Sequence, residues 1–226
     1  MKIERVSEHI WALKTWMLFP VRVWIVAEED GVTLVDAGVG SMAKGILKFV
    51  EQLGAGQIRQ IVLTHGHSDH VGSVTSIREH HQVPVYVHPV EIPYMEGDIA
   101  YPRRKKAAAS LPKQLATPLS VDQEGRIESV GTLKGYHTPG HSPGHVVYYH
   151  EKDGVLLAGD LFTSKKGRLN RPMPMFTADM QEAVRSSRIV KELKPHRVEV
   201  CHGKPVFSAA DHLDEYMRMM NSSISI

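Results

Sequence analysis

A short apolar run that ends in a cluster of histidines constrains the fold of this chain more than any other feature. The run QIVLT predicts a buried strand, and HGHSDH (residues 65–70) follows it at once. In an extended or turning segment His65 and His67 can point the same way, whereas Asp69 and His70 belong to the next turn and can face a second ion. Imidazole suits zinc and other borderline metals, and carboxylate widens the choice towards manganese or iron. The segment therefore predicts a metal site at the end of a strand.

Three further segments place a histidine or an aspartate beside a turn or at the end of a strand. They are HTPGHSPGH (residues 137–145), the buried run LLAGD that ends at Asp160, and VCHG, in which His202 follows a strand. Proline and glycine restrict the backbone of the first of these segments. Taken singly, an aspartate after a strand is more often a cap or turn residue, and a lone histidine is more often a loop residue that binds no metal. Their order and their shared place at strand ends favour a common metal site.

Strand and helix patterns alternate along most of the chain. Asp30-Gly31 between two β-branched runs is typical of a hairpin, and Ser41 precedes a helical pattern as a candidate N-cap. The expected elements are a hairpin at 22–36, a second hairpin at 146–158, strands at 60–64, 83–87 and 198–201, and helices at 42–53, 71–80, 177–193 and 208–220. This alternation predicts an α/β fold in which helices cover a sheet.

The two halves of the chain contain similar stretches. The two expected hairpins read EEDGVTLVD and EKDGVLLAG, and each is followed by a helix, a short strand and a His-Gly pair. This repetition is compatible with two related halves. Because Asp-Gly hairpins are common, a chance match is equally compatible with it.

Length and composition allow one sizeable domain. A chain of 226 residues can bury roughly 70% of the surface that its unfolded form exposes, so it needs no disulfide, and its single cysteine can form no internal one. A formal charge of +2 gives no global field for nucleic acid or membranes. The first residues, MKIERVSEHIWALK, lack the apolar core of a signal peptide. We therefore expect a cytoplasmic protein without a nucleic-acid or membrane partner.

Residues 94–120 interrupt the regular pattern. They contain basic residues and three prolines and show no sustained period. Long loops inside compact domains are uncommon and are often functional. We predict that this segment is a lid or insertion that helps to select the substrate.

The segments HGHSDH, HTPGHSPGH, LLAGD and VCHG, in this order, resemble the metallo-β-lactamase-fold superfamily and in particular its glyoxalase-II-like hydrolases. The resemblance spans nearly the whole chain. It implies one domain over residues 1–226, built as a four-layer αββα sandwich with a dinuclear metal site at one edge. It also implies that the first metal is held by His65, His67 and His141, the second by Asp69, His70 and His202, and that both are bridged by Asp160.

The resemblance also bears on two neighbours of these residues. His145 is expected to support the ligands rather than to bind metal, because the family's ligand follows a Pro-Gly pair, here at residues 139–140. Cys201 is adjacent to His202 and could be taken for a ligand. We interpret it instead as a small buried apolar residue, which strand alternation turns away from His202.

The resemblance implies hydrolysis by a hydroxide shared between two divalent cations, most readily zinc, with manganese or iron as alternatives. Asp69 would be the catalytic residue, because it would both bind metal and orient the attacking water. The stretch Gly159 to Phe162 is similar to the GDxLF segment of thioesterases in the family, but it is one residue shorter. The glutathione-binding helical region and the tyrosine of the lactonases are not apparent. A small thioester, ester or lactone is the expected substrate.

Other functions stay open at this point. A mononuclear iron held by His65, His141 and Asp160 would resemble the persulfide dioxygenases, and two metals would also serve a phosphodiesterase or nuclease. A metal-dependent binding protein is a third alternative. The basic runs 103–106 and 165–168 are typical of solvated surface, but at the mouth of the site they would favour an anionic substrate. The sequence makes no prediction about the oligomeric state.

Overall fold

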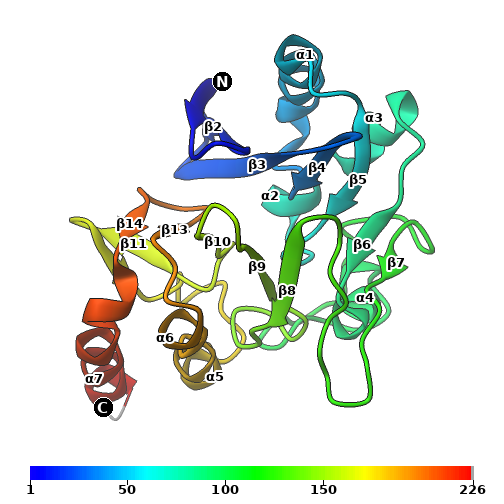
Figure 1. The fold of residues 1–226 in the computed structure, drawn as a ribbon. Helices are drawn as coiled ribbons and strands as arrows, with labels where there is room; N and C mark the ends of the chain where they lie inside the picture. The colour runs from blue at the N-terminus through cyan, green and yellow to red at the C-terminus, as the bar shows by residue number, and fades with distance from the viewer. Residues whose placement is uncertain (225–226) are drawn as a thin grey trace.

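Two mixed sheets form the centre of the computed structural model, which describes residues 1–224 (Figure 1). The first sheet has seven strands in chain order, namely β1 (Lys2–Arg5), β2 (Ile10–Trp16), β3 (Pro20–Glu28), β4 (Gly31–Val35), β5 (Ile58–Val62), β6 (Val85–Val87) and β7 (Thr117–Pro118). The second sheet has the order β14 (Val206–Phe207), β13 (Arg197–Glu199), β10 (Val155–Leu157), β9 (Val146–His150) and β8 (Leu133–His137). A separate hairpin consists of β11 (Thr163–Lys165) and β12 (Arg168–Asn170).

Helices lie against the outer face of each sheet. The helices on the side of the first sheet include α1 (Ala43–Leu53) and α3 (Val74–His80), whereas the second sheet is covered by α5 (Met180–Ser186), α6 (Ile189–Leu193) and α7 (Leu213–Ile224) (Figure 1). Two short helices, α2 (Ser68–Val71) and α4 (Ile92–Met95), lie in loops. No helix within residues 1–224 has the length and apolar character needed to cross a membrane.

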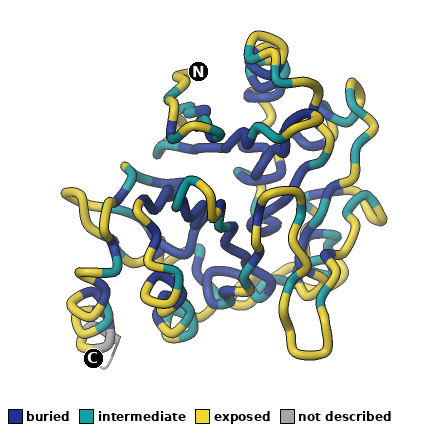
Figure 2. The backbone as a smooth tube through the Cα atoms, viewed as in Figure 1, coloured by how far each residue is buried: buried dark blue, intermediate teal, exposed yellow. Residues whose placement is uncertain are grey.

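The alternation of side chains on the second sheet shows why it lies between the first sheet and the helices. On β9, Val146 and Tyr148 belong to the apolar core shared with the first sheet, whereas Val147 belongs to the core beneath α5–α7. On β10, Leu157 belongs to the core shared with the first sheet and Leu156 to the core beneath the helices. Because successive strand residues point to opposite faces, both faces of this sheet are buried along its central strands β9, β10 and β13 (Figure 2). The four-layer αββα arrangement is thereby confirmed.

The two halves have the same local topology. In the first half, hairpin β3–β4 leads through α1 to β5, which pairs in parallel with β4. In the second half, hairpin β9–β10 leads through α5 and α6 to β13, which pairs in parallel with β10. Helices are the usual crossover between parallel strands. The carboxyl ends of β5, β10 and β13 consequently carry the segments that the sequence singled out.

Several predicted elements differ from those observed. The predicted helix 177–193 is two helices, because the chain turns at Ser187, whose hydroxyl bonds to Val184 O at 2.6 Å. Ser41 is not an N-cap, since it lies inside a 3₁₀ turn (Gly40–Met42) that precedes α1. The helix predicted at 71–80 is divided into α2 and α3, and the predicted strand 60–64 ends at Val62.

Segment 96–116 has no helix or strand between α4 and β7. Most of its basic residues are exposed, including those of the run 103–106. Arg103 nevertheless anchors the segment, because its guanidinium donates to Pro174 O (2.8 Å) and Thr177 O (2.7 Å). The segment is thus held against the loop that precedes α5.

A buried ion network joins the two sheets. Glu199 on β13 is fully buried and lies 3.1 Å from the guanidinium of Arg22 on β3, which is 3% exposed. Trp24 Nε1 on β3 also donates to Glu199, at 3.2 Å. On its own strand, Arg197 pairs with the same carboxylate at 2.6 Å. Glu199 therefore compensates two arginines within the contact between the sheets, and Glu4 lies 3.7 Å from Arg22 and 3.1 Å from Arg197.

We predict that Glu199→Ala lowers the free energy of unfolding by about 3–5 kcal/mol, because it removes the buried carboxylate from the Arg22 guanidinium and leaves only the partly exposed Glu4, at 3.7 Å. Asp214→Ala is the control, since Asp214 pairs with Lys191 on the exposed surface and exposed pairs contribute about 1 kcal/mol or less. Urea unfolding of both variants measures the difference. An equal, small loss in the two variants would show that Glu199 does not stabilise the sheet contact.

Candidate metal centre

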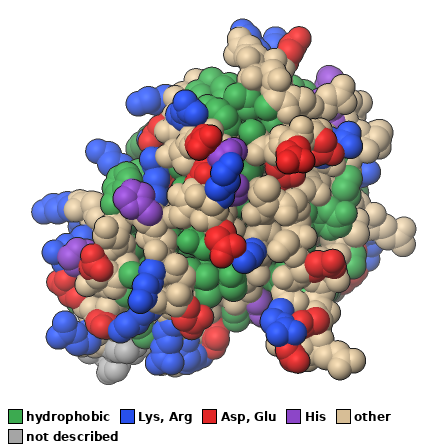
Figure 3. Space-filling view, viewed as in Figure 1, with side chains coloured by type: hydrophobic (Ala, Val, Ile, Leu, Met, Phe, Trp, Pro, Cys, Tyr) green, Lys and Arg blue, Asp and Glu red, His purple; other side chains and the backbone are tan. Residues whose placement is uncertain are grey.

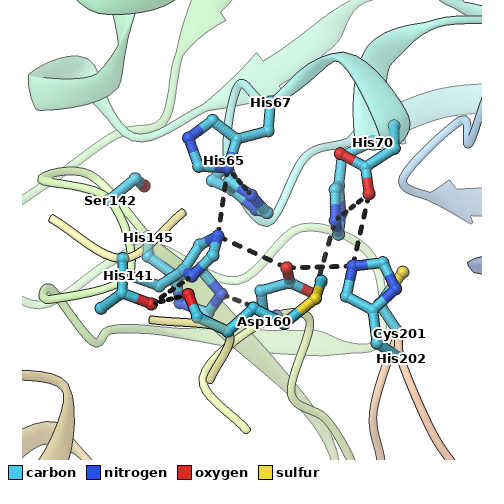
Figure 4. A network of polar contacts seen from close by, with 12 residues as sticks. His65, His67, His70, His141, Ser142, His145, Asp160, Cys201 and His202 are labelled. Carbon is cyan, nitrogen blue, oxygen red and sulfur yellow. Dashed lines mark hydrogen bonds and ion pairs between the residues drawn. The ribbon is translucent and has the colours of Figure 1, made fainter. Parts of the chain in front are cut away.

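The histidines and aspartates at the strand ends meet between the two halves of the chain (Figure 4). Residues 65–70 follow β5, and His141 lies in the loop between β8 and β9. Asp160 follows β10, and His202 follows β13. The structure brings all seven predicted donor residues together, in two sets that meet at Asp160.

The first donor set consists of three imidazole nitrogens. His65 Nε2 lies 3.0 Å from His67 Nδ1, which lies 3.1 Å from His141 Nε2. Tetrahedral zinc with bonds of about 2.0 Å places its nitrogen ligands about 3.3 Å apart. The set therefore fits one cation and leaves a fourth position open.

The second donor set combines carboxylates and histidines. Asp69 Oδ2 lies 3.8 Å from His70 Nε2 and 3.3 Å from His202 Nε2. Neither of these two nitrogens has a hydrogen-bond partner, although both are buried. Buried polar atoms without a partner are rare, and an absent ion is one of the few explanations. The donor types and the unpaired nitrogens both fit a second cation.

Asp160 lies between the two sets. Its Oδ2 is 3.4 Å from His141 Nε2 and 3.1 Å from His202 Nε2, and its Oδ1 is 3.5 Å from His70 Nε2. Its side chain is almost fully buried, and Oδ1 has no hydrogen-bond partner. The carboxylate can therefore bind one cation of each set.

In three of the histidine ligands, the ring nitrogen that does not face the donor sets contacts a residue that the sequence did not single out. His70 Nδ1 lies 2.7 Å from Asp36, His141 Nδ1 lies 3.2 Å from Thr177 Oγ1, and His202 Nδ1 donates to Pro20 O at 2.7 Å. Such contacts fix the ring orientation and the tautomer of a metal ligand. Asp36 directly follows the apolar run of β4, and this position at a strand end was its only signal in the sequence.

His145 supports the centre in the way the sequence predicts. Its Nδ1 lies 2.9 Å from Thr138 Oγ1, and its Nε2 accepts a hydrogen bond from the backbone N–H of Asp160 at 3.2 Å. Burial lowers the pKa of His145 to about 3, so the ring is neutral and can accept this bond. His145 therefore fixes the turn that carries Asp160.

Glu91 is a second residue that sequence reasoning missed. It is fully buried, and it accepts hydrogen bonds from Gly66 N–H (2.9 Å), Tyr101 Oη (2.7 Å), Ser142 Oγ (2.9 Å) and Gly144 N–H (2.7 Å). These partners belong to the two ligand loops and to segment 96–116. A single carboxylate thus holds together three pieces of chain around the first donor set, and no motif surrounds it in the sequence.

Electrostatics keep the first donor set neutral. Burial lowers the pKa of His67 to about 4 and holds the pKa values of His65 and His141 well below the usual range. All three rings are therefore uncharged at pH 7 and keep the lone pairs that a cation requires.

In the second donor set, the charges of the histidines and of the carboxylates compensate each other. Burial lowers the pKa of His70, but the electrostatic influence of the Cys201 sulphur and of the Asp36 and Asp160 carboxylates outweighs burial and raises the pKa well above its usual value. Burial raises the pKa of Asp160, yet the positive charges of His202 and His70 outweigh it and hold the pKa well below the usual range. Without metal, protons on the histidines compensate the carboxylates. A bound cation would replace those protons.

A small cavity of about 110 Å³ opens onto both donor sets. Arg104, Met173 and Phe176 line it together with ligand residues. The basic run 165–168 does not reach this cavity; it lies instead in hairpin β11–β12, beside a separate cavity of about 250 Å³ next to α7. Figure 3 shows several lysine and arginine side chains around that helix. Of the two basic runs, only 103–106 contributes to the mouth of the metal centre.

Cys201 is fully buried, as expected, but it is not turned away from the centre. Its sulphur lies within 4.8 Å of a donor atom of His70, of Asp160 and of His202. Strand β13 ends at Glu199, so strand alternation no longer determines where Cys201 and His202 point. That part of the sequence interpretation was wrong.

The geometry agrees with comparisons to known proteins. The sequence model of the metallo-beta-lactamase superfamily matches residues 16–202, a span that includes all seven donor residues. YybB, a probable metallo-hydrolase of Bacillus subtilis (strain 168), is 34% identical over 210 residues, which cover 91% of this chain and 93% of that protein. YflN, a probable metallo-hydrolase of the same organism, is 31% identical and covers 81% of this chain and 80% of its own length.

Solved structures show the same architecture. The metallo-beta-lactamase family protein TTHA1429 from Thermus thermophilus has a TM-score of 0.72 at 22% identity, with 98% of this chain and 82% of that chain covered. At that identity the likeness concerns the fold. The structure of TTHA1623 in a di-iron-bound form has a TM-score of 0.67 at 28% identity and covers 87% of this chain and 94% of that chain.

We predict that Glu91→Ala weakens metal binding at the first donor set by roughly 10–100-fold, the usual effect of removing a group that supports metal ligands. The loops that carry His67 and His141 would lose their common acceptor. Competition with a chromophoric chelator measures the affinity. Glu96→Ala is the control, because Glu96 accepts only from Gln114 N–H in the neighbouring segment. Equal affinities in the two variants would contradict this role of Glu91.

Proposed function

The chain belongs to the metallo-beta-lactamase superfamily, and from that premise we propose that it is a dinuclear metallo-hydrolase that cleaves a small thioester, ester or lactone. The observation that carries the proposal is the pair of donor sets that meet at Asp160. Three nitrogens form one set, and a mixed carboxylate and histidine set forms the other. Two sets with one shared carboxylate are what two neighbouring cations require.

Zinc is the metal we propose for both positions, because the two donor sets together consist of imidazole nitrogens and carboxylate oxygens, which zinc binds in catalytic sites. When bound, two such cations would lower the pKa of water and polarise the oxygen of the scissile group. The neighbour solved in a di-iron-bound form makes iron the first alternative.

Asp69 is the catalytic residue in this proposal. Its carboxylate lines the cavity, beside His67 and His202. Burial raises the pKa of Asp69, but the positive charges of His70 and His202 outweigh burial and lower the pKa. The group is therefore an acceptor at pH 7, so it can orient the attacking water and take its proton. That proton can then pass to the leaving alcohol or thiol.

The cavity sets the size of the reacting group. Its volume is only about 110 Å³, whereas pockets that enclose a whole small ligand have about 300–1,000 Å³. Only the scissile group and its nearest atoms fit, and the rest of the substrate must extend over the rim. Phe19 packs edge-on against His202, with ring centroids 4.6 Å apart, and the neighbouring Trp16 and Leu18 are 70% and 87% exposed. This exposed apolar turn suits an acyl chain or ring.

Arg104 favours a substrate that also carries negative charge. Its guanidinium lies 5.5 Å from the centre of the Phe176 ring, at the mouth of the cavity. Within residues 1–224 no carboxylate forms an ion pair with it. An arginine in this position can bind a carboxylate or phosphate on the substrate. We therefore propose a small anionic substrate.

Other functions have less support from the arrangement of these residues. A mononuclear iron enzyme would need only His65, His141 and Asp160, and would leave the second donor set without a role. The exposed basic residues of segment 96–116 are the only support for a nuclease. We also propose a cytoplasmic location, on the ground of the single cysteine.

Elemental analysis together with Asp69→Ala tests the dinuclear hydrolase. We expect two zinc ions per chain, and a fall in kcat of roughly 10²–10⁴-fold in the variant, the range for losing a group that transfers a proton. Hydrolysis of small thioester, ester and lactone substrates gives the rates. One iron per chain, or near-normal turnover by the variant, would contradict the proposal.

Arg104→Gln tests the anionic substrate. We expect KM for a carboxylated ester to rise about tenfold, equivalent to about 1.4 kcal/mol, and the difference from the unchanged protein to shrink at high salt, because exposed charges are screened. KM for a neutral ester of the same size should not change. Lys105→Gln is the matched control, since Lys105 does not line the cavity. Equal effects on charged and neutral esters would exclude charge recognition.

A further inference from the structure

The single cysteine of the chain lies at the second donor set. Its backbone N–H donates to Gly159 O at 3.0 Å, which places Cys201 beside the turn that carries Asp160. Figure 4 shows it next to His202, at the end of the cluster away from His141. The geometry points to Cys201 as a further donor for the second metal position, an assignment that rests on the dinuclear site proposed above.

The sulphur lies within reach of a cation shared with three other residues. One donor atom each from His70, Asp160, Cys201 and His202 lie within 4.8 Å of one another. Bonds from zinc to sulphur and to nitrogen are about 2.3 Å and about 2.0 Å long, so in a tetrahedral site the two ligand atoms are about 3.5 Å apart. A set confined in this way can close on one cation through small side-chain movements.

The other members of the set independently indicate a ligand at this point. His70 Nε2, Asp160 Oδ1 and His202 Nε2 are buried without a hydrogen-bond partner. An unsatisfied buried polar atom costs about 1–3 kcal/mol. The remaining ring nitrogens of the two histidines are already engaged, by Asp36 and by Pro20 O. Both Nε2 atoms lie 3.1–3.5 Å from an oxygen of Asp160, and the sulphur belongs to the same group of donors. A cation bound among these groups would give each nitrogen a partner.

The backbone of Arg22 can contact the Cys201 sulphur both as a free thiol and as a metal-bound thiolate. Arg22 N–H donates to Cys201 Sγ at 3.5 Å, a contact that a metal-bound thiolate would keep. Arg22 O lies 3.6 Å from the same sulphur and accepts the proton of a free thiol. When the sulphur binds the cation, the S–H bond breaks, its proton goes to solvent and the sulphur electron pair forms the new bond. Nothing is oxidised or reduced.

A sulphur donor would make the two metal positions chemically different. The first set offers three imidazole nitrogens, whereas the second would offer sulphur, nitrogen and oxygen. Thiolate favours zinc and cobalt over manganese and magnesium, which prefer oxygen. The second position would then select its metal more strongly for zinc than its carboxylates alone would.

Cobalt(II) substitution tests the assignment without using activity. Metal-free protein is titrated with cobalt(II) under argon, and the near-ultraviolet spectrum is recorded at each addition. We expect a thiolate-to-cobalt charge-transfer band that grows with one of two equivalents, and only Cys201 can supply it, because the chain has one cysteine. Cys201→Ser should lose the band and still bind two cobalt ions. Cys201→Ala serves as a second variant should the serine variant fold poorly.

The outcomes separate this assignment from the proposed function. Two bound cobalt ions without a thiolate band would show that Cys201 is a buried thiol that donates to Arg22 O, and the dinuclear site would stand. Failure of the protein to bind a second equivalent would overturn both the dinuclear site and the role of Cys201. A band that persists in Cys201→Ser would also overturn the assignment, because it could not arise from this residue.

Discussion

The buried carboxylate of Asp36 joins the ends of two parallel strands, and the metal centre depends on that junction. It accepts hydrogen bonds from the backbone N–H (2.7 Å) and the hydroxyl (2.8 Å) of Thr64, and it lies 2.7 Å from His70 Nδ1. Asp36 follows β4 and Thr64 follows β5, so one side chain sets both the spacing of the strand ends and the orientation of a ligand ring. Its φ of 57° is a left-handed conformation that aspartate tolerates better than most residues.

His141, Asp160 and His202 come from the second sheet and the other donors from the first, so the packing of the two sheets determines the shape of the centre. Asp160 and His202 follow β10 and β13, and the core between the sheets contains alternate residues of β9 and β10. Glu199 adds a buried ionic contact to β3 only a few residues before His202. Because close-packed interiors transmit small displacements, a shift of one sheet against the other would separate the two donor sets at Asp160.

Much of this arrangement could be predicted from the sequence, since its signals are local. HGHSDH directly follows an apolar run, and Asp160 and His202 end similar runs, so strand ends alone bring these residues together. Glu91 and Cys201 could not be placed in this way. Glu91 acts through partners 25 and more positions away, at Gly66 and Gly144. The direction of Cys201 depends on where β13 ends, and a boundary of one or two residues reverses a prediction based on alternation.

The hydrogen bond from Tyr101 to Glu91 has a consequence for motion. Segment 96–116 crosses the mouth of the centre, and the same carboxylate that holds Tyr101 also holds the loops of His67 and His141. If Tyr101 moved outward to admit a substrate, Glu91 would keep three partners instead of four, and the first metal would be less firmly enclosed. Access to the site and retention of its metal are thus linked equilibria. A substitution that opens the entrance would also make the metal exchange faster.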